Sequence, residues 1–422
     1  MRIFGFQGQK MFYIIGISIA FFLGLLLLSK NGKTPADKIL TCWLFLIGIH
    51  LLCFYLYFSR LSYQYPYLLG LDVPLPLMQG PFLFLYTASL TNQSTGRKWL
   101  FLHFIPVIIS YSYLIVFFYF LPAAQKVDIF KKEGLGFETF SLVNLSAIVI
   151  SGITYIIWSI ILLRRYRMGI LNYFSFTEKV NLKWLQYLIY GISGIWILIF
   201  FGDEYIFAGV VLFVLFMGYF GIKQVGIFTY QNLNTQLPHP MVYKKNELVQ
   251  SEPVSIGRLN TEEPLLEGQR FAEPDNFVAE EAQTTIIPDE KLEKKKYQKS
   301  GLTLEMAENL HSRLTTLMHA EKVYTESELL LSELAHRLDT LPNYLSQVIN
   351  EKEGKNFYDY INTLRVEEFK RLISIPENKK YTILSLSYDC GFNSKSSFNK
   401  NFKKVTGQSP SEYVNSRNIE SV

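Results

Sequence analysis

The chain has 422 residues, enough for two or three domains, and 49% of them are hydrophobic. Its net charge of +5 conceals three segments: residues 1–230 carry 17 Lys and Arg against 8 Asp and Glu, residues 231–300 carry 9 against 12, and residues 301–422 carry 15 against 16. Three cysteines give no disulfide framework, no pair of the six histidines has metal-ligand spacing, and no phosphate-binding loop or nucleophile motif occurs, so the sequence predicts no enzyme, metal site or cofactor.

The first 230 residues are dominated by long apolar runs. A bilayer core about 30 Å thick needs roughly 20 apolar residues in a helix, because lipid offers the backbone no hydrogen-bond partner. Seven runs meet this test: Met11–Ser29, Ile39–Phe58, Leu68–Leu90, Trp99–Leu121, Thr139–Leu163, Trp184–Phe201 and Tyr205–Ile222. Asp72 and three prolines interrupt the third run, which predicts a kinked helix or a helix broken by a re-entrant piece. We therefore predict a seven-helix transmembrane bundle over residues 1–230.

The distribution of Lys and Arg around these runs predicts how the bundle lies in the membrane. Basic residues near the ends of a span resist translocation and accumulate on the cytoplasmic side. With the N-terminus outside, the inner segments carry 11 Lys and Arg and the outer segments carry 6, and the opposite orientation would reverse this bias. We therefore expect the N-terminus outside and everything after Lys223 in the cytoplasm.

Residues 231–300 lose the apolar pattern. They contain several prolines, the acidic pairs Glu262-Glu263 and Glu280-Glu281, and the mixed-charge run EKLEKKKYQKS. Low hydrophobicity with mixed charge is typical of disordered segments. We predict a flexible linker that lets the last part of the chain move while keeping it near the membrane, and we expect no cleavage within it.

Residues 301–422 show the 3.6-residue period of amphipathic helices, and these helices follow a repeated pattern. The stretch ESELLLSELAHRL predicts one helix. After a turn, Pro342 suits the first position of another helix, which Gly354 can end. A longer helix follows, Thr382 then caps a short helix, Gly391 supplies a turn, and a final polar helix begins. We predict an all-α domain with two helix-turn-helix units joined by a linking helix.

The second helix of the second unit, NSKSSFNKNFKKV, combines an aromatic stripe with basic and polar residues. Asn393 or Ser394 can cap it, and we expect Phe398, Phe402 and Val405 to share one buried face. The outward face that remains holds no acid: Lys395, Ser396, Ser397, Asn399, Lys400 and Lys403. Such side chains can hydrogen-bond to base edges in a DNA major groove, so this face predicts DNA binding.

From about Tyr324 to Ser416 the sequence resembles the DNA-binding domain of the AraC/XylS transcription regulators. The most specific part is CGFNSKSSFNKNFKKVTGQSPSEY, in which these residues fall where the family's pattern puts them: Gly391, Phe392, Phe398, Phe402, Gly407, Pro410 and Tyr413. The segment LPNYLSQVINEKEGKNFYDYINTLRVEE resembles the first unit and the linking helix. Asp339 departs from the pattern, which often has glycine in this turn, but aspartate tolerates the left-handed conformation better than most residues.

The resemblance implies that two recognition helices enter successive major grooves on one face of double-stranded promoter DNA. The residues that it implies for DNA contact are Asn343, Ser346, Gln347, Lys395, Ser396, Ser397, Lys400, Lys403 and Lys404. The stretches MQGPFLFLYTASLTN and LFLHFIPVIIS also look like the N-terminal region of some membrane-bound regulators with this domain, which implies a multi-pass protein of the bacterial cytoplasmic membrane.

Three functions fit these predictions. The first is a membrane-anchored one-component transcription regulator, whose bundle senses a signal and whose cytoplasmic domain binds DNA, with homodimerisation raising occupancy. The second is a transporter or receptor with an accessory domain, which the scarcity of charged residues within the spans disfavours. In the third, the helix-turn-helix domain binds a protein, which the polar outward face disfavours. The signal, the operator and the sign of regulation do not follow from the sequence.

Overall fold

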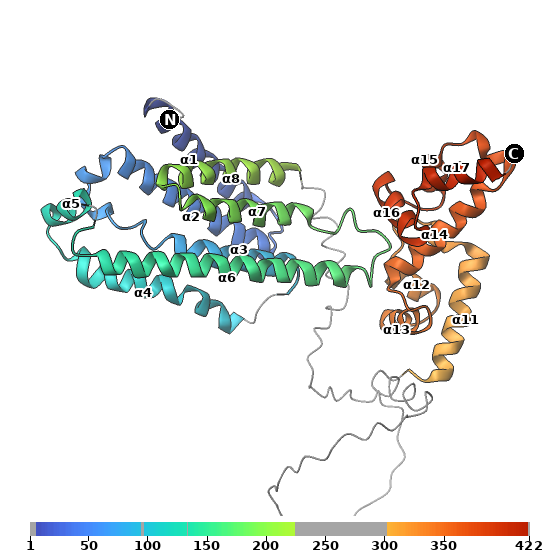
Figure 1. The fold of residues 1–422 in the computed structure, drawn as a ribbon. Coiled ribbons are helices and arrows are strands. Elements are labelled where there is room, and N and C mark those ends of the chain that lie inside the picture. The colour runs from blue at the N-terminus through green and yellow to red at the C-terminus, as the bar shows by residue number, and fades with distance from the viewer. Residues whose placement is uncertain (1–5, 94–96, 133, 224–301, 421–422) are drawn as a thin grey trace, which may run out of the picture.

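The computed structural model describes residues 6–93, 97–132, 134–223 and 302–420. Within these ranges every regular element is a helix, apart from one isolated antiparallel bridge between Phe174 and Leu330, which confirms the predicted all-α class. Figure 1 shows a long bundle formed by α1 to α8 and a smaller domain formed by α11 to α17. The predicted linker over residues 231–300 lies outside the described residues.

Apart from α5, which lies between the fourth and fifth predicted runs, the helices of the bundle follow the apolar runs of the sequence. They are α1 (Phe6–Ser29), α2 (Pro35–Phe58), α3 (Pro76–Leu90), α4 (Ile105–Leu114), α5 (Ala123–Lys131), α6 (Glu138–Ile170), α7 (Lys183–Leu198) and α8 (Asp203–Lys223). A 3₁₀ segment at Arg97–Phe104 leads into α4, and a π-helical turn at Ile115–Tyr119 continues it. The bundle core contains Trp43 and Leu51 from α2, Ile189 from α7 and Val211 from α8, so α2, α7 and α8 share one core.

Four helical segments of the described residues are long and apolar enough to cross a membrane: Lys10–Ser29, Pro35–Phe58, Leu100–Tyr119 and Glu138–Ile170. The third predicted run is interrupted as expected, because 3₁₀ turns precede α3, which starts only at Pro76 and contains Pro81. With 15 residues in α3 and 16 in α7, these helices are shorter than the roughly 20 residues that a bilayer core requires. Seven spans therefore remain a prediction.

The C-terminal domain is built from seven described helices. They are α11 (Leu304–Glu321), α12 (Leu331–Arg337), α13 (Pro342–Lys352), α14 (Phe357–Ile373), α15 (Ile383–Asp389), α16 (Lys395–Thr406) and α17 (Pro410–Glu420). One core joins α11, α12, α13 and the first half of α14, and a second core joins the other half of α14 to α15 and α16. The buried members of both cores come only from residues 302–402, so this domain has hydrophobic cores of its own.

The turns of this domain follow their predicted chemistry. Asp339, between α12 and α13, has the left-handed φ of 46° that was expected for it, and Pro342 occupies the first turn of α13. Gly354 follows α13 with φ 64°, and Gly391 joins α15 to α16 with φ 92°. Thr382 caps α15 by accepting a hydrogen bond from the Ser385 N–H at 3.0 Å. These turns set the directions of α13 and α16.

Candidate nucleic-acid interface

Helix α16 is fixed at both ends by local hydrogen bonds. Ser394 has extended backbone angles, and its hydroxyl accepts a hydrogen bond from the Ser397 N–H at 3.1 Å. Gly407 follows the helix with φ 78°, and its N–H donates to the Lys403 carbonyl at 2.9 Å. Of the two predicted caps, Asn393 and Ser394, the structure uses Ser394. The cap sets where α16 begins and therefore which of its side chains face the core.

The aromatic stripe of α16 packs against the linking helix α14. Phe398 and Phe402 are buried, and their ring centroids lie 4.8 and 5.5 Å from that of Phe369. Tyr413 packs on Phe402 at 5.3 Å. The prediction that these two α16 phenylalanines are core is confirmed, but the same prediction for Val405 is wrong. Val405 is 37% exposed because it lies in the last turn of α16, beyond the last residue that the second core buries.

The outward face of α16 is basic and polar. Its exposed members among the predicted contacts are Lys395, Ser396, Lys400, Lys403 and Lys404. The prediction that Ser397 points outward is wrong, because Ser397 belongs with Phe398 and Asn401 to the buried stripe and is only 7% exposed. The Asn401 amide donates to the Ser397 carbonyl at 3.0 Å. Ser397 therefore lies on the buried face of α16 and is not among the residues that can contact DNA.

Lys404 differs from the other lysines of α16. Its Nζ donates to the Asp359 carboxylate at 2.6 Å, which ties α16 to the first turn of α14. This ion pair places a carboxylate of the same domain beside the Lys404 ammonium. Lys404 is therefore expected to attract a phosphate less strongly than the exposed Lys403 does.

The predicted contacts on α13 are neutral. Asn343 is exposed, whereas Ser346 and Gln347 are partly buried. The Gln347 amide donates to the Glu351 carboxylate at 3.1 Å, one turn further along the helix. The Glu351 carboxylate repels phosphate, so α13 is suited to hydrogen bonding with bases and poorly suited to attracting the DNA phosphate backbone.

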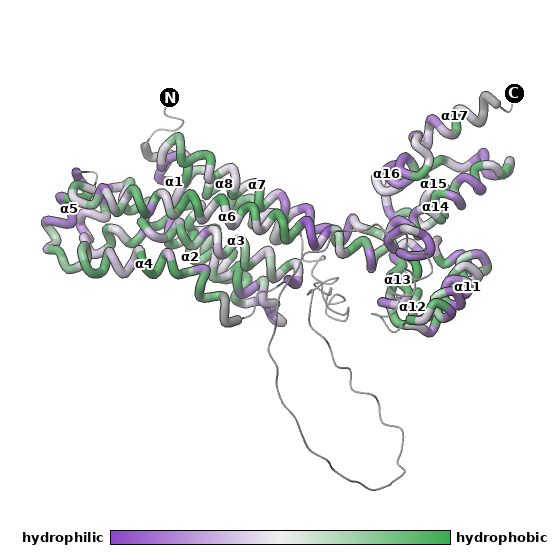
Figure 2. The backbone as a smooth tube through the Cα atoms, turned by 60° about the horizontal axis from the view of Figure 1, so that its bottom comes forward, coloured by the Kyte–Doolittle hydropathy of each residue, from purple (hydrophilic) through white to green (hydrophobic). Residues whose placement is uncertain are grey.

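The fold brings the two helices that carry the predicted contacts to one side of the domain. Figures 1 and 2 show α13 and α16 at the side of the domain nearest the bundle, with α11 and α17 farther away. Figure 2 also shows that the bundle helices are largely hydrophobic and that α16 is largely hydrophilic. The two helices with predicted base contacts therefore lie on the same side of the domain.

A buried arginine on α14, which the sequence analysis missed, holds the domain together. The Arg365 side chain is 1% exposed, and it donates to the carbonyls of Tyr324 and Glu326 at 2.7 Å each. Burial lowers the pKa of Arg365 to about 10, which leaves it protonated at neutral pH. The available signal was its spacing, because Ile361 and Phe369, one turn to either side, are apolar.

Glu368, also on α14, accepts charged hydrogen bonds from two basic side chains. Arg371 donates to it at 2.7 and 2.9 Å, and Lys322 donates at 2.9 Å. Chiefly because of the Arg371 hydrogen bonds, the pKa of Glu368 is lowered to about 2. The ionised carboxylate thus fastens the chain before α12 to the linking helix.

We expect Glu368→Gln to lower the free energy of unfolding by about 2–3 kcal/mol at pH 7, because the buried carboxylate loses its charge and with it the charged hydrogen bonds from the partly exposed Arg371 and Lys322. The pKa of Glu368 is lower in the folded protein than in the unfolded chain, so the ionised carboxylate stabilises the fold at pH values above the unfolded pKa. This contribution disappears as the pH falls from about 4.5 toward about 2. Urea titrations of the wild type and the variant at pH 7 and pH 3 should show the difference shrinking at pH 3. The neighbouring exposed Glu367→Gln is the control and should cost below about 1 kcal/mol at either pH.

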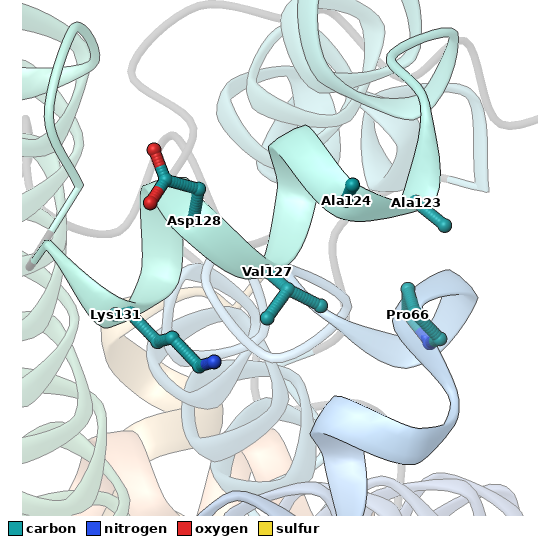
Figure 3. A pocket seen from close by; sticks show the side chains of 6 residues that line it. All are labelled: Pro66, Ala123, Ala124, Val127, Asp128 and Lys131. Carbon is teal, nitrogen blue, oxygen red and sulfur yellow. The ribbon is translucent and has the colours of Figure 1, made fainter.

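The structure also contains a pocket at the far end of the bundle. Its volume is about 370 Å³, and it is lined by Pro66, Ala123, Ala124, Val127, Asp128 and Lys131. Figure 3 shows these side chains coming from α5 and from the turn at Pro66. The lining combines apolar contacts with one acid and one base and defines no particular ligand. Among the described residues there is no group of three or more His, Cys, Asp or Glu side chains that could hold a metal ion.

Comparison with known proteins identifies the type of domain to which α13 and α16 belong. Residues 334–416 match a family described as a helix-turn-helix domain, so the C-terminal part of the chain carries a helix-turn-helix domain of the AraC type. The match lies within the range from Tyr324 to Ser416 that the sequence motifs indicated. The predicted resemblance is therefore confirmed for this domain.

Similar proteins match about a quarter of this chain. An uncharacterized HTH-type transcriptional regulator of Staphylococcus aureus (strain COL) is 30% identical over 96 residues, which cover 23% of this chain and 12% of that protein. The uncharacterized HTH-type transcriptional regulator YtdP of Bacillus subtilis (strain 168) is 28% identical over 105 residues, 25% of this chain and 13% of that protein. The chain thus spans about one eighth of the length of these relatives. No solved structure matches.

Proposed function

We propose that the protein is a membrane-anchored one-component transcription regulator that binds promoter DNA through α13 and α16. The observation that carries this proposal is the surface of α16. Its phenylalanines are buried, whereas Lys395, Lys400 and Lys403 are exposed and no acid lies on the helix. Lysines attract the phosphate backbone and can donate to guanine in the major groove. The match to a helix-turn-helix domain and to proteins named as transcriptional regulators supports the same function.

In this proposal the domain contains two helix-turn-helix units. The first consists of α12 and α13, the second of α15 and α16, and α14 links them. Because the N-terminal part of a recognition helix contacts base edges, these residues are proposed to read bases: Asn343, Ser346, Gln347, Lys395, Ser396 and Lys400. Lys403 is proposed to contact phosphate, with a smaller contribution from Lys404 because of its pairing with Asp359.

The bundle is proposed to lie in the bacterial cytoplasmic membrane. In the four apolar segments only 17–39% of the most hydrophobic window is buried inside the protein. Side chains such as Phe22, Leu142 and Ile150 are more than half exposed. A surface of this kind is stable in lipid and not in water. We propose seven spans with the N-terminus outside, a signal that acts on the bundle, and a cytoplasmic DNA-binding domain that can pair in a homodimer.

Selection of DNA by the C-terminal domain tests this function. The fragment of residues 300–422 is mixed with random duplex DNA at two salt concentrations, and the retained DNA is sequenced. We expect an enriched motif with two blocks about one helical turn apart, and weaker retention at higher salt because lysines displace counterions. Absence of any enriched motif at both salt concentrations would count against a DNA-reading domain and favour a protein-binding one.

A further inference from the structure

The segment between α6 and α7 lies against the C-terminal domain. Figure 1 shows the green loop that follows α6 reaching the domain near α12, α14 and α16. Its residues 171–180 are distant in sequence from the domain, yet they join it through backbone hydrogen bonds. The Ser175 N–H donates to the Leu329 carbonyl at 3.2 Å, and the Leu331 N–H donates to the Tyr173 carbonyl at 3.0 Å. The segment therefore adds a short antiparallel bridge beside α12.

Side chains of α14 hold the same segment. Arg365 donates to the carbonyl and to the hydroxyl of Ser175 at 3.2 Å each, and Asn362 donates to that carbonyl at 3.0 Å. At the first turn of α14, the Tyr358 N–H donates to the Leu171 carbonyl at 2.9 Å, which satisfies a helix-terminal donor. Ser175 is only 1% exposed. The contact between the segment and α14 is thus made by specific hydrogen bonds, and it buries Ser175 at its centre.

The apolar part of the contact is small. Phe174, Phe176 and Val180 form a buried cluster with Ile170, and Leu330 is the domain side chain that packs against it. The two cores of the domain take their buried residues from elsewhere, and among the segment's side chains only the partly buried Tyr173 packs against the first of them. The segment can therefore leave the domain without removing a buried member of either domain core.

The end of the segment places an acid at the start of α16. The Ser394 hydroxyl, which caps this helix, donates to the Glu178 carboxylate at 3.3 Å. The next residue, Lys179, forms an ion pair with Glu328 of the domain. A helix N-terminus favours anions, and in DNA-bound helices it is a place where phosphate binds. The carboxylate, held by the residue that precedes Lys395 in the chain, therefore occupies a position that suits a DNA phosphate.

The position of the segment also restricts access to the domain. The helices α13 and α16 lie at the side of the domain nearest the bundle, and the segment joins bundle and domain on that side. A duplex that reached both helices would have to enter between the domain and the bundle. Docking of the segment and binding of a duplex thus compete for the same side of the domain.

We propose that residues 171–180 are an internal inhibitor of DNA binding. Docked, the segment directs the recognition helices toward the bundle and places Glu178 where a phosphate would bind at α16. A change in the bundle that moves the ends of α6 and α7 withdraws the segment and frees both recognition helices. The inference rests on the proposed DNA-binding function, and it identifies the element through which the bundle controls that function.

Two substitutions in the full chain, embedded in phospholipid nanodiscs, test this inhibition. Glu178→Gln removes the acid at α16, and we expect it to tighten binding of the selected duplex roughly two- to fivefold. Phe174→Asp places a charge in the apolar cluster and should undock the segment, with a larger gain. The control Glu377→Gln neutralises an exposed acid of the same domain in the turn Pro376–Lys380, which follows α14, and its effect should be smaller than that of Glu178→Gln.

Hydrogen exchange of the full wild-type chain gives a readout that charge alone does not change. On addition of the selected duplex, amides of residues 171–180 and of the first turn of α14 should exchange faster, because the hydrogen bonds of the docked segment are broken. The inference would be overturned if these amides exchanged equally slowly with and without the duplex and if the wild type and both variants bound the duplex with equal affinity. The segment would then be a fixed structural part of the domain. If neither the full chain nor the fragment of residues 300–422 retains any duplex, the proposed function itself fails and the inference fails with it.

Discussion

Replacing Gly391 with alanine is expected to lower the free energy of unfolding of the C-terminal domain by about 3 kcal/mol or more. Gly391 turns the chain between α15 and α16 with φ 92°, a conformation that side chains with a Cβ rarely adopt. A Cβ at this position would lie 2.6 Å from the Thr325 carbonyl oxygen and 2.8 Å from its carbon. These are backbone atoms of another segment, so relief requires α16 to shift away from the rest of the domain.

The matched control for this prediction is Gly407→Ala. Gly407 also has a positive φ, 78°, but a Cβ there would meet no atom within 4 Å. Its loss should be limited to the conformational cost of about 1–2 kcal/mol. Urea titrations of residues 300–422 followed by circular dichroism would measure both losses. Equal losses in the two variants would show that the close approach to Thr325 does not matter.

The second large effect concerns DNA binding. Lys395→Ala and Lys400→Ala are each expected to weaken binding of the selected duplex by roughly 10- to 100-fold, because each removes an exposed donor from the proposed reading face of α16. The preference for particular bases at one of the two blocks of the DNA motif should become weaker at the same time. Lys403→Ala should instead weaken binding of all sequences similarly and lower the salt dependence by about one unit of slope.

Fluorescence anisotropy titrations at several salt concentrations would measure these effects. Lys404→Ala should cost less than Lys403→Ala, because Lys404 is already paired with Asp359. The control Lys379→Ala removes an exposed lysine of the same domain outside both proposed recognition helices and should have little effect. A uniform, purely salt-dependent loss of DNA affinity in all four α16 variants would mean that α16 attracts DNA without reading its sequence.

Much of the domain could be predicted from local chemistry. The aromatic spacing of Phe398 and Phe402 identified the buried face of α16, and Asp339 and Gly391 marked the two turns. These predictions succeeded because helix periodicity and turn conformation depend on neighbouring residues. The errors at Ser397 and Val405 have a related cause. Periodicity gives the direction of a face, but the width and end of that face depend on how α14 and α16 pack.

The contact between the segment after α6 and the domain could not be predicted. Ser175 and Arg365 are 190 residues apart, and neither a serine in a loop nor an arginine in a helix signals a partner at that distance. In the sequence, the loop between α6 and α7 is marked only by its positive charge. Its Phe174 and Phe176 belong to a small buried cluster that packs against Leu330 of the domain.

Protection of guanine N7 from methylation, with the full chain in nanodiscs on the selected duplex, tests the central claim most directly. This atom lies in the major groove, where α13 and α16 are proposed to bind. The account predicts two clusters of protected guanines about one helical turn apart on one face of the duplex, and loss of one cluster in the Lys395→Ala, Lys400→Ala double variant. A single cluster that survives this double variant, or no protection under conditions in which the duplex is retained, would contradict the account.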